Sequence, residues 1–303
     1  MRAGTGNARK HPRRRQSLPP GRDHYAGQRH RRQDRGQGSG VSESVIAHIR
    51  RVAPTLLIAM LVTSCVRGVD GTAKPAAGLV PRPVTGEAIQ QVLPEAGQLS
   101  QLLGQSIVAD DIREPPKFGG IDDMPNGVFA SAKNTPRECG GVVGLLQQNP
   151  YRGSTVKNFI EHDFASGRST RPVKVAVVYA GVVALAKAAD ADELFGTFSH
   201  QWAGCDGKTM SIFKQDGTLN QTRKIISVRA ADSVLVANFQ TTSSDGYMIM
   251  TSHALGIRVN CIVEVEVGFQ NEYQSPVLVG TGDPDISALQ IAHTMMDKVS
   301  ELS

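Results

Sequence analysis

Aromatic residues are scarce in this sequence: Phe, Trp and Tyr make up 5% of its 303 residues, and there is a single Trp. A core must therefore be built mainly from Val, Ile, Leu and Ala. Motifs of catalysis are also missing, because there is neither a Gly-x-Ser-x-Gly elbow nor a His-Glu-x-x-His helix. His162, His200, His253 and His293 are scattered without metal-ligand spacing. The sequence predicts no metal, no cofactor and no enzyme.

Apolar runs long enough to span a bilayer are missing as well, and one short apolar run ends in a cysteine. Arg50 and Arg51 precede the apolar stretch from Thr55 to Val62, which is shorter than the roughly 20 residues that span a bilayer. Val62-Thr63-Ser64-Cys65 then fits a bacterial lipobox. We expect residues 41–64 to be a lipoprotein signal peptide and Cys65 to carry the lipid that anchors the protein on the extracytoplasmic face of the cell membrane. The alternative is an ordinary buried core helix.

The net positive charge of the chain comes from residues 1–64. Residues 1–40 account for +9 of the formal charge and residues 41–64 for +1, so a chain that begins at Cys65 carries about −5 against +5 for the whole. The basic segment 1–40 has too few apolar residues for a core and is expected to be disordered. A basic arm before an export signal suggests that translation starts near Val41 or Val45. We therefore expect no nucleic-acid partner.

The remaining chain predicts a tether followed by one domain. Residues 65–84 are rich in Pro, Gly and Ala, and residues 85–303 suffice for one sizeable domain. Helical patterns are expected over Gly86–Leu103, Val182–Trp202 and from Asp283-Pro284 onward, and residues 104–135 are expected to be irregular. Strand patterns follow period-2 alternation or turn signals; they cover Val173–Tyr179, Thr209–Lys214, Lys224–Phe239 (as two strands), Tyr247–Val259 and Cys261–Phe269. The fold class is α+β, a twisted antiparallel sheet flanked by helices.

The strand Cys261–Phe269 has the clearest pattern of all. Cys261, Val263, Val265, Val267 and Phe269 share one face, and two glutamates point the other way. This alternation predicts an antiparallel strand with one buried face.

Several motifs, taken in order, resemble the extracellular sensor domain of the mycobacterial receptor kinase PknH, which also occurs alone in mycobacterial lipoproteins. The resemblance covers residues 85–303 and rests on Leu93–Leu103, Pro136-Arg137-Glu138-Cys139, Phe195–Cys205 with its Trp-Ala-Gly-Cys ending, Gly246-Tyr247, His253-Ala254-Leu255, Asn260 and Asp283–Leu302. It implies a twisted antiparallel sheet with helices and a ligand cleft. Tyr247 replaces the usual Trp, a cysteine near Thr251 is absent, and Cys261 stands where Val is usual.

Three cysteines remain if Cys65 is lipidated, and three cannot all pair. Cys139 and Cys205 lie in Gly-flanked loops at element ends, whereas Cys261 lies on the apolar side of a strand. Position and resemblance together favour a Cys139–Cys205 disulfide over any pairing of Cys261, which we expect to be a buried free thiol.

The function expected from this sequence is binding rather than catalysis. Trp202, His200 and Tyr247 lie at element ends in the segments that carry the resemblance, and they are the candidate ligand-binding residues for an envelope lipid or glycan. The alternative for Trp202 is a core position beside the disulfide. Two further functions stay open, a protein-interaction module of the envelope with an unknown partner and an enzyme that acts on envelope lipid or glycan.

Three structural features would separate these functions. An apolar cleft with a few polar groups would favour ligand binding, and a large flat apolar patch would favour a protein partner. A hydroxyl or thiol bonded to a histidine would favour an enzyme.

Overall fold

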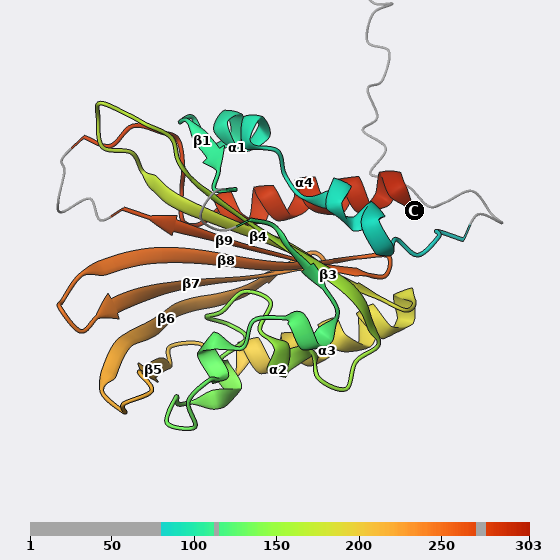
Figure 1. The fold of residues 1–303 in the computed structure, drawn as a ribbon, viewed down its shortest axis with the longest axis horizontal. Coiled ribbons are helices and arrows are strands. Elements are labelled where there is room, and N and C mark those ends of the chain that lie inside the picture. The colour runs from blue at the N-terminus through green and yellow to red at the C-terminus, as the bar shows by residue number, and fades with distance from the viewer. Residues whose placement is uncertain (1–79, 112–114, 271–276) are drawn as a thin grey trace, which may run out of the picture. The chain divides into compact units, whose positions relative to one another are not determined.

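The structure is a computed structural model that describes residues 80–111, 115–270 and 277–303. These residues all fall in one compact unit, residues 71–303. They form a large antiparallel sheet with four α-helices, which confirms the predicted α+β class (Figure 1). The sheet order is β1-β3-β4-β9-β8-β7-β6-β5, and β2 also pairs with β3.

The elements follow one another along the chain with four short 3-10 helices among them. Their bounds are η1 Gly86–Val92, α1 Ala96–Leu103, β1 Ile107–Ala109, β2 Lys117–Gly119, η2 Ile121–Asp123, η3 Gly127–Phe129, η4 Arg137–Cys139, α2 Gln148–Tyr151, β3 Val156–Ser166, β4 Val175–Leu185, α3 Ala188–Ala203, β5 Thr209–Phe213, β6 Leu219–Ala231, β7 Val234–Ser243, β8 Met248–Arg258, β9 Cys261–Phe269 and α4 Ser287–Leu302.

Helices cover both faces of the sheet. Helices α1 and α4 lie on one side of it, and α2 and α3 lie on the other (Figure 1). Alternate residues of β4 enter separate cores: Val182 packs in the core that includes α4, and Val183 packs in the core that includes α3. A strand buried on both faces is apolar almost throughout rather than at every second position.

The start of α3 differs from the expectation. Val182–Leu185 belongs to β4, and the helix begins only at Ala188. The β-branched pair Val182-Val183 suits a strand that is covered on both faces, and that burial overrides the helical spacing. Helical spacing also puts Leu194, Phe195, Phe198 and Trp202 on one face; of these, Leu194, Phe198 and Trp202 are buried and Phe195 is partly buried.

Strand β9 has the predicted bounds, but both of its faces are buried. Glu264 and Glu266 are buried as well, and Glu264 accepts from Leu146 and Tyr151 in the segment before β3, so the expectation of a single buried face is wrong. Strand β3 was not predicted, since its polar residues Asn158, Glu161 and His162 interrupt any apolar alternation. Helix α4 begins at Ser287 rather than at Asp283, because residues 284–286 form a turn.

Candidate functional site

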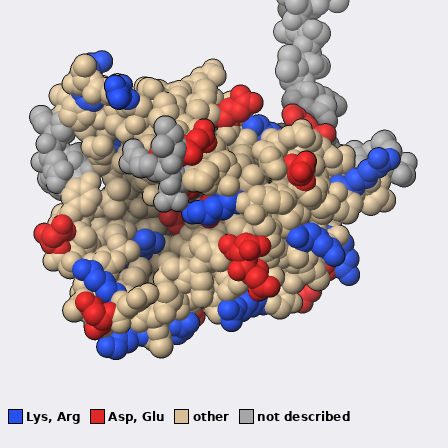
Figure 2. Space-filling view, in the orientation of Figure 1, with Lys and Arg blue, Asp and Glu red and all other residues tan. Residues whose placement is uncertain are grey.

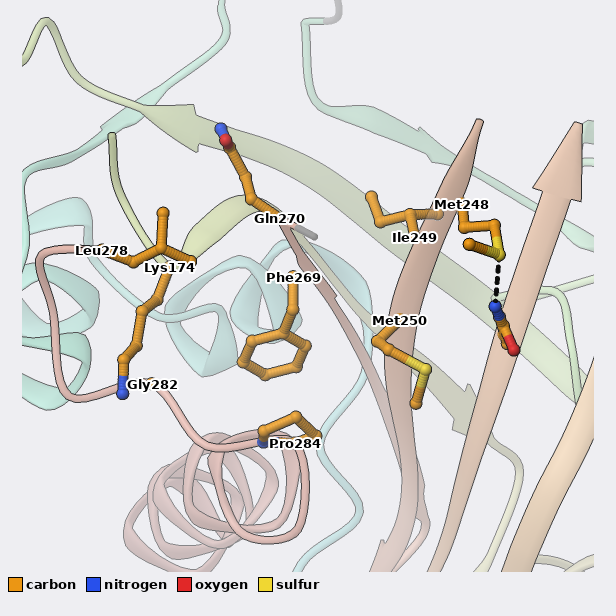
Figure 3. Close-up of a pocket in the computed structure, with 10 residues that line it drawn as sticks. Lys174, Met248, Ile249, Met250, Phe269, Gln270, Leu278, Gly282 and Pro284 are labelled. Carbon is orange, nitrogen blue, oxygen red and sulfur yellow. Dashed lines mark hydrogen bonds between the residues drawn. The ribbon is translucent and has the colours of Figure 1, made fainter. Parts of the chain in front are cut away.

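A cleft of about 590 Å³ opens at one end of the sheet, on the face that α4 covers (Figure 3). Its lining combines apolar side chains with a lysine and two glutamines; it consists of Lys174, Gln240, Met248, Ile249, Met250, Phe269, Gln270, Leu278, Gly282 and Pro284. Ligand pockets in proteins commonly measure about 300–1,000 Å³ and are mostly apolar with a few placed polar groups. This cleft has both properties.

The register of the sheet builds the apolar floor. Phe269 of β9 pairs with Val175 of β4 on one side and with Met250 of β8 on the other, and Met250 pairs in turn with Gln240 of β7. Paired residues of neighbouring strands point to the same face, so these side chains form one row across four strands. Figure 3 shows Phe269 and Met250 pointing toward Pro284, just ahead of α4.

The wall of the cleft depends on a glycine. A Cβ atom at Gly282 would lie 2.6 Å from Val175 Cγ2 and 3.4 Å from Phe269 Cε1. Real Cβ atoms do not approach another carbon at 2.6 Å, so only glycine lets the chain pass this close to the strand ends. This close passage places Pro284 over the floor.

The polar groups of the cleft lie at its edge. The Lys174 backbone is fixed on both sides, because its N–H donates to Val279 O at 2.9 Å and its carbonyl accepts from Gln270 N–H at 2.8 Å. The Gln240 amide contacts Met248 Sδ at 2.8 Å (Figure 3). Within the described residues the Lys174 ammonium makes no ion pair. The cleft thus offers an apolar interior and, among the described residues, the Lys174 ammonium without an ion-pair partner.

A buried polar network lies on the opposite face, around His253. His253 Nδ1 donates to Val142 O at 2.9 Å, and Nε2 donates to Glu264 Oε2 at 3.1 Å. The same carboxylate accepts from the Leu146 N–H at 2.9 Å and from the Tyr151 hydroxyl. Since both ring nitrogens face acceptors, the geometry suits a protonated imidazole that donates one hydrogen bond to Val142 O and one to the Glu264 side chain.

The pKa directions agree with this pairing. Burial alone would lower the pKa of His253, but the Glu264 hydrogen bond and the nearby Glu266 charge outweigh it, so the pKa is raised. Burial and the Glu264 charge raise the pKa of Tyr151 well above its ordinary value. The hydrogen bonds of His253 and Glu264 reach Val142, Leu146 and Tyr151, so this network ties the segment 142–151 to the sheet.

Asn260, which belongs to one of the motifs that carry the family resemblance, also makes hydrogen bonds that hold segments of the fold together. Its side chain accepts from the Val84 N–H at 2.8 Å and donates to Val84 O at 3.0 Å and to Leu185 O at 2.8 Å. It therefore joins the start of the domain to the end of β4.

None of the three predicted ligand-binding residues lines the cleft, although Tyr247 directly precedes Met248, which does. Trp202 is 0% exposed, and its ring centroid lies 4.8 Å from that of His253, in the same core as the disulfide. His200 is exposed on α3, and Tyr247 is 45% exposed in the turn before β8. The structure brings none of them together, and for Trp202 it shows the core position that the sequence left as the alternative.

The described cysteines have the states that the sequence predicted. Cys139 and Cys205 form a disulfide that links η4 to the end of α3, with their Cα atoms 5.6 Å apart, which confirms the predicted pair. Cys261 is a buried free thiol, and burial raises its pKa to about 12. Cys65, the predicted lipid attachment site, lies outside the described residues.

The cleft residues were missed because they come from five separate segments of the chain. Phe269 was recognised only as an inward-facing strand residue, and Lys174 and Met250 carry no motif. The Asp283-Pro284 turn was the one local signal at this site, and it was assigned to the start of a helix.

These observations define a class of protein domain. It has an extended antiparallel sheet with helices on both faces, a helix whose end is held by a disulfide, and an apolar cleft at one end of the sheet. A family model described as PknH-like extracellular domain matches residues 84–298. The chain belongs to this family, which confirms the resemblance seen in the sequence.

A solved structure shares the fold. The extracellular domain of PknH from Mycobacterium tuberculosis matches with a TM-score of 0.57 and 17% sequence identity, over 73% of this chain and 100% of that one. No curated protein matches the chain. Within the described ranges no helix is long and apolar enough to cross a bilayer. The same part of the chain contains no group of three His, Cys, Asp or Glu residues arranged to hold a metal ion.

Proposed function

We propose that this chain is an extracytoplasmic lipoprotein, anchored through Cys65, whose sensor-type domain binds an amphiphilic ligand without transforming it. The cleft around Phe269 is the observation that carries this proposal. Its apolar interior suits an acyl chain, and a sugar would find few hydrogen-bond partners there. An envelope lipid is therefore favoured over a glycan.

The single cation of the cleft indicates the charge of the ligand head group. Lys174 lies beside Gly282 at the edge of the apolar floor and has no carboxylate partner in the described part of the chain (Figure 3). An anionic head group would pair with this ammonium while the chain covers Phe269 and Met250. The two glutamine amides would add neutral hydrogen bonds.

The other two functions have less support in the structure. The buried His253 contacts a carbonyl and a carboxylate, not a hydroxyl or thiol that it could activate as a nucleophile. Large exposed apolar side chains such as Val108, Phe118, Leu219 and Ile286 lie on different elements. A scattered set of this kind is normal for a protein surface and does not by itself indicate a protein partner.

The test is a titration of the purified full-length chain with cis-parinaric acid, a fluorescent fatty acid. Met250→Glu places a charge in the cleft floor and should weaken binding at least tenfold, because an unpaired charge in an apolar site costs well over the 1.4 kcal/mol that corresponds to a factor of ten. Lys174→Gln should weaken binding several-fold and reduce its dependence on salt.

Two control variants match these changes elsewhere on the surface. Lys224→Gln removes an exposed lysine of β6, and Ile226→Glu places a charge on an exposed position of the same strand. Both should bind the fatty acid as the parent does. Equal weakening by Met250→Glu and Ile226→Glu would contradict the assignment of the cleft.

A further inference from the structure

A second cavity lies on the opposite face of the sheet from the cleft and differs from it in chemistry. It has a volume of about 390 Å³ and lies between β3, β4, β6, β9 and the segment 125–147. Glu161, Glu266, Tyr179 and Arg223 line it, together with amides such as that of Gln147. Figure 2 shows a recess in the surface in which acidic side chains are visible between basic ones at its margin.

Two buried carboxylates of this cavity have unmade hydrogen bonds. Glu161 is 9% exposed and Glu266 is 8% exposed, and neither Glu161 Oε2 nor Glu266 Oε1 has a hydrogen-bond partner in the described part of the chain. The cation nearest to Glu266 Oε1 is His253 Nδ1, at 3.7 Å, which already donates to Val142 O. An unpaired buried polar atom is unfavourable, so a native structure normally supplies a partner for it.

The arginine of the cavity does not supply these partners. Arg223 Nη1 donates to Val143 O, and the guanidinium lies 5.6 Å from the Phe239 ring centroid. With its amide oxygen facing Arg223, Gln221 accepts from Nε at 3.3 Å and from Nη2 at 3.1 Å. The arginine thus donates to neutral acceptors. The other cations near the two carboxylates are His253, close to Glu266, and Lys117, which stands opposite Glu161 across β2 and β3.

We propose that this cavity binds a small polar molecule that carries a protonated amine. An ammonium group has one positive charge and three N–H donors, and these donors can supply partners for the unpartnered carboxylate oxygens. A metal ion fits less well, because the described residues contain no cluster of three metal-ligating side chains. The site goes beyond the lipid-binding cleft and does not depend on it.

The probe is ethanolamine, added to the full-length chain at pH 8 in an amine-free buffer and followed by calorimetry and saturation-transfer NMR. Ethylene glycol is the matched neutral probe, since a hydroxyl replaces its ammonium. Ethanolamine should bind, and ethylene glycol should bind at least tenfold more weakly. Glucosamine and glucose repeat the comparison between an amine and a hydroxyl on a larger polar molecule. Their affinities relative to ethanolamine show how much of the cavity a ligand can fill.

Three variants locate the binding. Glu161→Gln and Glu266→Gln keep the shape of the side chain and should each reduce ethanolamine affinity at least tenfold, whereas Glu193→Gln, an exposed position on α3, should leave it unchanged. Parinaric acid binding should persist in all three, which separates this site from the cleft. Equal binding of the charged and neutral probes, unchanged affinity in Glu161→Gln, or binding of Mg²⁺ or Ca²⁺ without binding of the amine would overturn the proposal.

Discussion

Replacing Glu161 by Gln should change the stability of the domain in a pH-dependent way. Burial raises the pKa of Glu161 from its ordinary 4.5 to about 7, and the charges of Asp163, Glu264 and Glu266 act in the same direction while that of Lys117 opposes them. The folded state therefore binds this proton more tightly than the unfolded state does. The favourable contribution is complete below pH 4.5 and is lost as pH rises through 7.

The magnitude follows from the size of the shift. A shift of about 2.5 pKa units corresponds to about 3 kcal/mol between the protonated and ionised forms. Gln cannot ionise, so Glu161→Gln should match the parent at pH 4 and should exceed its free energy of unfolding by up to about 3 kcal/mol at pH 8.

Urea unfolding at pH 4, 5, 6, 7 and 8 in amine-free buffer measures this difference, with Glu193→Gln as the exposed control. The gain in Glu161→Gln should grow between pH 5 and pH 7 and level off by pH 8, and the control should show no trend. A gain that is independent of pH, or a variant less stable than the parent at pH 8, would refute the reasoning about burial at Glu161.

Three other predictions follow from the cysteines and the tryptophan. Replacing Cys139 and Cys205 by Ser should lower the free energy of unfolding by about 4 kcal/mol, because the disulfide restricts a loop of 66 residues in the unfolded chain. Cys261→Ala should lower it by less. Equal losses for the two changes in urea unfolding would contradict a stabilising role for the disulfide. Trp202→Phe should destabilise the domain by about 1–3 kcal/mol and spare parinaric acid binding, so a folded variant that had lost binding would return Trp202 to the ligand site. Cys65→Ser should move the protein from the detergent phase to the aqueous phase on partitioning, and full retention in detergent would rule out Cys65 as the anchor.

The fold was largely predictable because its strongest signals are local. The period-2 pattern of Cys261–Phe269 gave both bounds of β9, and the Gly-flanked positions of Cys139 and Cys205, together with the family resemblance, gave the disulfide. The boundary between β4 and α3 was missed, since a strand buried on both faces and a buried helix have similar apolar content.

The sites were not predictable, because they depend on what covers each face of the sheet. The alternation in β9 placed Glu264 and Glu266 on one face, but only the fold shows that α3 and the segment 142–151 bury that face. The cleft similarly joins β8, β9 and the turn before α4, and no short stretch of sequence contains it. Trp202 was a candidate because it lies at an element end in a segment that carries the resemblance, but its large side chain packs in the core.

The central claim is that the cleft around Phe269 and Met250 holds an amphiphile. The most direct measurement is native mass spectrometry of the full-length chain purified from its own membranes without added lipid. The account predicts a bound molecule with an acyl chain, at least tenfold less abundant in Met250→Glu and unchanged in Ile226→Glu. A chain that carries no small molecule, or one that carries the same amount in Met250→Glu, would contradict it.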